Sequence, residues 1–120
     1  MSDFSGDEAI LVTAHAGALR SAIENVIHNA VIHGGSEVHV SLEQEGEHAI
    51  LSVTDSGGGV DAGELDRLFE PFFRATRSGA TEGTGLGLAI AARALAMHDG
   101  TITARNVEPG LRVEMRLPVA

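Results

Sequence analysis

Three groups of residues have the types and the spacing expected of a nucleotide-binding site. Asn25 and Asn29 stand four residues apart in a segment with helical periodicity. Asp55 begins the run Asp-Ser-Gly-Gly-Gly-Val after a strand-like segment, and the run Gly-Thr-Gly-Leu-Gly-Leu, residues 83–88, opens a helix-like segment. Glycines at strand ends and helix starts let the backbone approach a phosphate closely, and helix N-termini favour anions. Together the three groups predict a nucleotide site, which none of them would predict alone.

The side chains in these groups suit different parts of a nucleotide. The amide oxygen of an asparagine suits Mg²⁺, a hard cation that also takes substrate phosphates as ligands. On spacing alone, however, Asn25 and Asn29 fit surface amides bonded to water equally well. Asp55 shares its strand face with apolar residues, where a carboxylate is costly without a partner. It could be a plain turn former before glycine, but its inward position favours a hydrogen bond from the exocyclic amine of adenine.

The basic residues narrow the class of phosphate site. All eight are arginine and none is lysine, which excludes a phosphate-binding loop of the G-x-x-x-x-G-K-[ST] kind. Arg74 and Arg77 precede the second glycine run and are either solvated loop charges or phosphate contacts. Four histidines show no metal-ligand spacing (His15, His39, His48 and His98), and three phenylalanines are expected in the core (Phe69, Phe72 and Phe73).

Composition restricts the broad class of the protein. The 120 residues are enough for one compact domain, which we expect to span 1–120. The net charge of −9 argues against sequence-independent binding to nucleic acid or direct contact with an anionic membrane. Cysteine is absent, which excludes disulfides and fits a reducing compartment, and the sequence contains no membrane-spanning run.

Hydrophobic periodicity predicts an α/β protein. We expect residues 1–8 to be frayed and residues 74–82 to form a loop. Helices are predicted at 18–33, 61–68 and 86–98, and strands at 10–13, 37–43, 49–53, 101–106 and 111–117. The strands alternate apolar and polar residues, so one face of the sheet meets water. The expected fold is therefore a two-layer α/β sandwich whose mixed, mostly antiparallel sheet is covered on one face by three helices.

In order along the chain, the motifs resemble those of the catalytic, ATP-binding domain of bacterial sensor histidine kinases. Residues 19–33 are similar to the family's N box, 55–60 to its first glycine box D-x-G-x-G, 68–74 to its F box and 83–88 to its second glycine box. The resemblance implies a Bergerat-type ATP fold, ATP and Mg²⁺ as ligands, and γ-phosphate transfer to a histidine.

The resemblance also implies roles for individual residues. Asn29 would ligate Mg²⁺, Asn25 would lie near the phosphates, and Asp55 would hold the adenine amine. Residues 74–82 would form a mobile ATP lid from which Arg74 reaches the phosphates, so Asn25, Asn29 and Arg74 form the implied catalytic set. The other implied ATP-binding positions are His33, Gly57, Gly59, Val60, Arg77, Gly83, Thr84, Gly85, Leu86, Gly87 and Leu88.

The chain departs from the family pattern at two informative places. Ile32 stands where many members carry a basic residue, so one phosphate cation is missing. None of the six histidines has the context of a phosphoacceptor, and no dimerisation domain is evident. The resemblance therefore implies a domain that acts on the dimerisation and phosphohistidine domain of a kinase. A response regulator would follow downstream, and the setting would be cytoplasmic, within an inner-membrane sensor.

Other activities of the same fold remain open at this point. Gyrase-type and chaperone-type ATP hydrolases place a glutamate one turn before the metal-binding asparagine, where this chain has Asn25, which cannot act as a base. Glu24 is adjacent but is rotated roughly 100° around the helix. A serine kinase of the same fold and a nucleotide-binding module without catalysis are the remaining alternatives.

Overall fold

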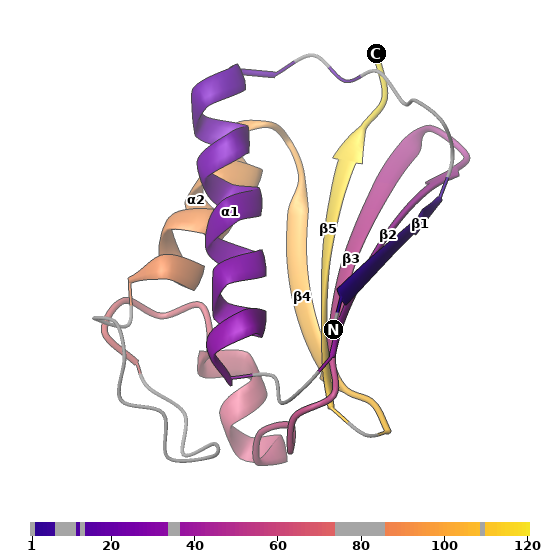
Figure 1. The fold of residues 1–120 in the computed structure, drawn as a ribbon. Coiled ribbons are helices and arrows are strands. Elements are labelled where there is room, and N and C mark those ends of the chain that lie inside the picture. The colour runs from indigo at the N-terminus through magenta and orange to yellow at the C-terminus, as the bar shows by residue number, and fades with distance from the viewer. Residues whose placement is uncertain (1, 7–11, 13, 34–36, 74–85, 109) are drawn as a thin grey trace.

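The computed structural model describes residues 2–6, 12, 14–33, 37–73, 86–108 and 110–120, which form two layers. One layer is a five-stranded sheet with the strand order β1-β2-β3-β5-β4. The other consists of helices α1 and α2 and the short helix η1, which cover one face of this sheet (Figure 1). The predicted two-layer α/β sandwich is therefore confirmed. Among the described residues, no helix is long and apolar enough to span a membrane.

The sheet is mixed and mostly antiparallel, as predicted. Its strands are β1 (Ser2–Gly6), β2 (Val38–Glu45), β3 (His48–Asp55), β4 (Thr101–Asn106) and β5 (Leu111–Pro118). Strands β2 and β3 form a hairpin whose register places Glu45 opposite His48, and Gly46 takes the turn with a φ of 61°. Strand β5 lies between β3 and β4 and is antiparallel to both. The last hairpin therefore sits beside the strand that carries Asp55.

The first strand differs from the sequence prediction. Residues 1–8 were expected to fray, yet Ser2–Gly6 pairs in parallel with β2 from Val38 to Leu42. The edge of β2 offers backbone groups that any segment can pair with, so an apolar pattern is not required. The strand predicted at 10–13 falls mostly outside the described residues, and Val12, which is described, belongs to no strand.

The helices form where the apolar periodicity predicts them. Helix α1 spans Ala16–His33 and helix α2 spans Gly87–Met97, and the two pack side by side over the sheet (Figure 1). The third helix, predicted at 61–68, is the 3₁₀ helix η1 at Ala62–Arg67. Such helices are used in short pieces, which suits a six-residue segment that contains a glycine. The core between the layers includes the fully buried side chains Val26, Val53, Leu95, Leu111 and Met115.

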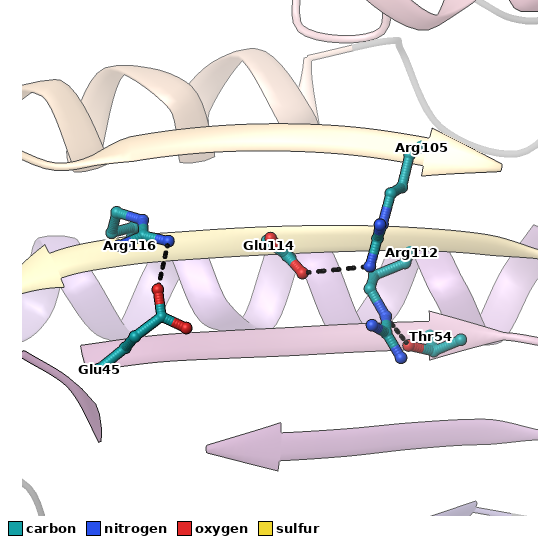
Figure 2. A network of polar contacts seen from close by, with 6 residues as sticks. All are labelled: Glu45, Thr54, Arg105, Arg112, Glu114 and Arg116. Carbon is teal, nitrogen blue, oxygen red and sulfur yellow. Dashed lines mark hydrogen bonds and ion pairs between the residues drawn. The ribbon is translucent and has the colours of Figure 1, made fainter. Parts of the chain in front are cut away.

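The opposite face of the sheet carries polar and charged side chains from β2, β3, β4 and β5 (Figure 2). Arg116 forms an ion pair with Glu45 at 3.4 Å, and Arg105 approaches Glu114 at 3.8 Å. The Nε–H of Arg112 donates to Thr54 Oγ1 at 3.0 Å. Three of the eight arginines thus serve the wet face, which confirms the alternation predicted for the last strand.

One aromatic residue lies in a different place from the prediction. Phe69 and Phe73 pack against the core as expected, but the side chain of Phe72 is on the surface, and the residue is 69% exposed. Its φ of 67° is unusual for a residue other than glycine. The turn after Pro71 therefore directs Phe72 outward, and its residue type alone does not indicate this exposure.

Candidate nucleotide-binding site

Asp55 is the last residue of β3, and its carboxylate is buried, with only 4% of the residue exposed. The position on the core side of the strand is the one that the alternating pattern predicted. Its Oδ1 atom accepts hydrogen bonds from the backbone N–H of Gly57 at 3.0 Å and from that of Leu111 at 3.3 Å. These bonds offset part of the cost of burying a charge. A carboxylate has about four acceptor positions, so it can serve the fold and also recognise a ligand donor.

The segment that follows Asp55 contains three consecutive glycines and therefore carries no side chains at residues 57–59. A Cβ atom added at Gly58 would meet nothing within 4 Å, and Gly58 is exposed. Gly59 is buried with a φ of 73°, a conformation that favours glycine. Val60, at the end of the segment, is 8% exposed and belongs to the core. The segment therefore begins at the buried Asp55 carboxylate, continues through three glycines, and ends at the buried side chain of Val60.

The two asparagines lie half-buried on α1, at the margin of its apolar face. Asn25 faces the start of α2, because a Cβ atom at Gly87 would lie 3.3 Å from its Oδ1. Its Nδ2 reaches Ser21 Oγ at 3.5 Å, a long and weak hydrogen bond. Asn29, one turn later, is also half-buried, whereas Glu24 and His28 are exposed as predicted. The structure therefore places Asn25 beside the end of the second glycine run.

The three motifs share one hydrophobic core. Val26, Val53, Val60 and Leu88 belong to the same buried cluster. Val60 and Leu88 are themselves predicted site residues. Val26 follows Asn25 directly, and Val53 lies two residues before Asp55. The asparagine helix, the end of β3, the first glycine segment and the start of α2 are therefore held on a common base, although they come from distant parts of the sequence.

Several predicted positions receive no test here. Arg74, Arg77, Gly83, Thr84 and Gly85 lie outside the described residues, as does the whole proposed lid at 74–82. His33 is described only as the last residue of α1. At the start of α2, Leu86 is half-buried at the N-cap position and Leu88 is buried in the core, so Leu88 contributes to packing.

Two residues of the β4–β5 hairpin contact predicted site residues, although the sequence alone did not indicate them. The side-chain amide of Asn106 bonds both backbone groups of Val60, and Gly110 packs against the backbone of Asp55. Nothing in the local sequence around Asn106 distinguishes it, because it ends a strand and precedes a turn, as many asparagines do. Only the register of β3, β5 and β4 brings it to the glycine segment.

The residues present fit ATP and Mg²⁺ chemically. A buried carboxylate can accept a hydrogen bond from an amine, and the glycines that follow it carry no side chains that would hinder a flat ring. The side-chain amide oxygen of Asn29 is a hard ligand of the kind that Mg²⁺ takes together with phosphate oxygens. Among the described residues there is no cluster of three or more His, Cys, Asp or Glu side chains suited to a metal ion.

Known proteins resemble this chain in both sequence and structure. The family described as histidine kinase-, DNA gyrase B- and HSP90-like ATPase matches residues 14–120. The sensor protein PfeS of Pseudomonas aeruginosa is 42% identical over 111 residues, which cover 91% of this chain and 25% of PfeS. The sensor histidine kinase YvrG of Bacillus subtilis is 40% identical over 105 residues, covering 85% of this chain and 18% of YvrG. The chain thus spans about a quarter or less of the length of these relatives.

Solved structures agree with the sequence relatives. The mycobacterial sensor histidine kinase MprB superposes with a TM-score of 0.87 at 29% identity, covering 98% of this chain and 84% of that one. The catalytic domain of the histidine kinase ThkA superposes with a TM-score of 0.83 at 27% identity, covering 98% and 78%. The chain therefore belongs to the family of histidine kinase-, DNA gyrase B- and HSP90-like ATPases, as a catalytic domain of the sensor histidine kinase type with the Bergerat ATP-binding fold.

Proposed function

We propose that this chain binds ATP with Mg²⁺ and donates the γ-phosphate to a histidine on the dimerisation domain of a two-component kinase. The observation that carries the proposal is the buried Asp55 carboxylate next to the open glycine segment, on the same core as Asn25 and Asn29. The full-length histidine kinase ShkA, solved in complex with AMPPNP, superposes on 99% of this chain with a TM-score of 0.81 at 26% identity. That similarity supports an ATP-type ligand for the domain.

Each residue of the site has a defined part in the proposed reaction. Asp55 accepts a hydrogen bond from the exocyclic amine of adenine, and Gly57 and Gly59 keep the approach to the ring free of side chains. Asn29 would hold Mg²⁺, which would supply charge neutralisation to the phosphates, and Asn25 on α1, next to the start of α2, would lie beside those phosphates. Arg74 and Arg77 supply positive charge from the lid. His33 flanks the adenine, and the backbone of Gly83–Gly87 meets the phosphates.

The chemistry itself requires little from the protein beyond positioning and charge. The imidazole nitrogen of the partner's histidine attacks the γ-phosphorus, an N–P bond forms, and the bond to the bridging oxygen of ADP breaks. Such a transfer is accelerated mainly by alignment and by stabilisation of phosphate charge. A domain that supplies no acceptor histidine can therefore still perform the catalytic part of the reaction.

Hydrolysis of ATP is the competing activity, and the position of Glu24 disfavours it. A hydrolase needs a carboxylate close to the attacking water, within hydrogen-bond reach. Glu24 is exposed on α1, whereas the half-buried position beside α2 is occupied by Asn25, which cannot accept the proton. The same geometry supports transfer to an imidazole, which is itself a sufficient nucleophile.

The proposal also assigns the setting of the domain. Its partners would be the two-helix phosphoacceptor domain and, downstream, a response regulator. As in sensor kinases generally, it would work in the cytoplasm as part of an inner-membrane sensor. Neither nucleic acid nor a direct membrane contact is expected, because the chain carries a net charge of −9.

The test combines calorimetric titration with a transfer assay. ATP is titrated into the chain with and without Mg²⁺, beside Asn29→Ala and, as a control on the exposed side of the same helix, His28→Ala. We expect saturable binding that Mg²⁺ strengthens, loss of the Mg²⁺ effect in Asn29→Ala, and no change in His28→Ala. Addition of a separate dimerisation domain and γ-labelled ATP should then give acid-labile phosphohistidine. No binding by the unmodified chain would refute the proposal.

A further inference from the structure

The side chain of Asn106, at the end of β4, grips the end of the first glycine segment. Its Oδ1 accepts a hydrogen bond from the Val60 N–H at 2.9 Å, and its Nδ2 donates to the Val60 carbonyl oxygen at 2.7 Å. One amide group thus satisfies both backbone groups of a single residue, as a neighbouring strand would. The contact joins positions 46 residues apart in the sequence.

The other end of the segment is held by the same hairpin. The Leu111 N–H donates to Asp55 Oδ1, and Gly110 packs so closely that a Cβ atom there would overlap the Asp55 carbonyl oxygen. Within the hairpin, the Val107 N–H donates to the Gly110 carbonyl oxygen at 2.8 Å and fixes the turn. The β4–β5 hairpin therefore braces the segment from Asp55 to Val60 at both ends.

The middle of the segment needs such bracing more than an ordinary loop does. Gly57, Gly58 and Gly59 are consecutive, and glycine loses more backbone freedom on ordering than any other residue. Gly59 also fits closely against Asn106, since a Cβ atom there would lie 2.6 Å from Asn106 Oδ1. A loop that is ordered before the ligand arrives does not lose this freedom on binding, which strengthens binding.

We propose that Asn106 is a positioning residue for the adenine side of the nucleotide site, acting through Val60 and the glycine segment. This inference rests on the proposed ATP binding and extends it to a residue outside the four sequence motifs. Asn106 touches the backbone of the segment, and Asp55, at the other end of that segment, makes the adenine contact. Its effect should therefore appear in affinity for the adenine moiety, and the contribution of Mg²⁺ and the phosphates should not change.

The experiment compares Asn106→Ala and Asn106→Asp with the unmodified chain. Asn106→Ala removes both hydrogen bonds, whereas Asn106→Asp keeps the acceptor for the Val60 N–H and loses the donor. Gln44→Ala is the matched control, because Gln44 Nε2 also donates to a backbone carbonyl in a hairpin turn, that of Gly46 at 3.2 Å. Affinities for ATP, ADP and adenosine are measured by calorimetry, and hydrogen exchange of the Val60 amide reports the order of the loop.

We expect Asn106→Ala to lower the affinities for ATP, ADP and adenosine by the same factor, on the order of tenfold. The effect of Mg²⁺ on ATP affinity should not change. Asn106→Asp should fall between Asn106→Ala and the unmodified chain, and Gln44→Ala should bind normally. Exchange at Val60 should accelerate in proportion to the loss of affinity. If Asn106→Ala fails to fold, Asn106→Asp carries the same comparison.

Two results would overturn the inference alone, and a third would overturn both the inference and the proposed function. If the unmodified chain binds ATP and the Asn106 variants bind it equally well, Asn106 has no positioning role and the proposed function stands. If the variants lose ATP affinity but keep that for adenosine, Asn106 acts on the phosphate end and the inference is wrong. If the unmodified chain binds no ATP, both the inference and the proposed function fail.

Discussion

Asp55 has both a structural and a recognition role in this reading, and two substitutions separate them. Asp55→Asn keeps the shape of the side chain and one acceptor oxygen for the N–H groups of Gly57 and Leu111, but replaces the other oxygen with an NH₂ group. Asp55→Ala removes both acceptors. The first variant should therefore stay close to the unmodified chain in stability and lose adenine recognition, and the second should lose adenine recognition and also be clearly less stable.

The structure allows the size of each effect to be worked out. Asp55 Oδ1 accepts two backbone hydrogen bonds, and bonds to a charged acceptor contribute about 1.5–3 kcal/mol each. Removing the buried charge recovers part of its desolvation cost, so we take the lower end, about 3 kcal/mol, for Asp55→Ala. Asp55→Asn keeps both bonds in weaker, neutral form and should cost about 1 kcal/mol. For a domain of this size, the difference corresponds to about 8 °C in Tm.

The assay must avoid intrinsic fluorescence, because the chain has neither tryptophan nor tyrosine. Urea unfolding followed by far-ultraviolet circular dichroism gives the free energy of unfolding, and calorimetry gives the ATP affinity. We expect Asp55→Asn to bind ATP at least about tenfold more weakly than the unmodified chain while remaining folded. ATP binding by Asp55→Asn within twofold of the unmodified value would refute the adenine contact. Equal stability of the two variants would refute the structural role.

Three other substitutions, one of them with a matched control, probe the packing around the site and the polar face of the sheet. Leu95→Ala, at a residue 1% exposed in the core, should lower the free energy of unfolding by about 3 kcal/mol, and a loss below about 1 kcal/mol would contradict the packing. Gly110→Ala should cost at least about 3 kcal/mol because its Cβ would overlap the Asp55 backbone, whereas Gly63→Ala, where nothing lies within 4 Å, should be nearly neutral. Arg116→Ala should change stability by less than about 1 kcal/mol, since the ion pair with Glu45 is largely exposed. In all three cases urea unfolding is the measurement, and for Arg116→Ala a loss of several kcal/mol would contradict the expectation.

The sequence predicted the regular elements well because their signals are local. Helix α1, which ends at His33, follows from apolar residues at helical spacing. The alternation in β5 follows from having one face of the strand in water. The inward position of Asp55 followed from the same parity argument. Each of these inferences uses only residues that are neighbours in the sequence, within one or two turns or along one strand.

The sequence predictions were wrong where the apolar pattern does not determine the backbone conformation. Strand β1 forms because β2 offers an edge, and its own residues carry no apolar alternation to announce it. Phe72 is exposed because of a turn with positive φ, although its residue type favours burial. Strand β1 thus depends on a distant partner and Phe72 on the backbone conformation of its own turn, and the apolar pattern shows neither.

Asn106 shows why a motif-based reading stops short of the complete site. The four motifs identify segments that would face the nucleotide under the proposed function, since side chains and glycines in contact with a ligand leave a pattern along the chain. A residue that supports such a segment through its backbone needs only a side-chain amide at the right register of a neighbouring strand. Asparagines in such positions are common and carry no distinguishing local pattern. The register Asn106↔Leu111, together with β5 lying beside β3, places this amide against Val60. If the proposal for Asn106 holds, the sheet topology determines how well ordered the glycine segment is before a nucleotide binds, whereas the glycines determine only how closely a nucleotide can approach the backbone.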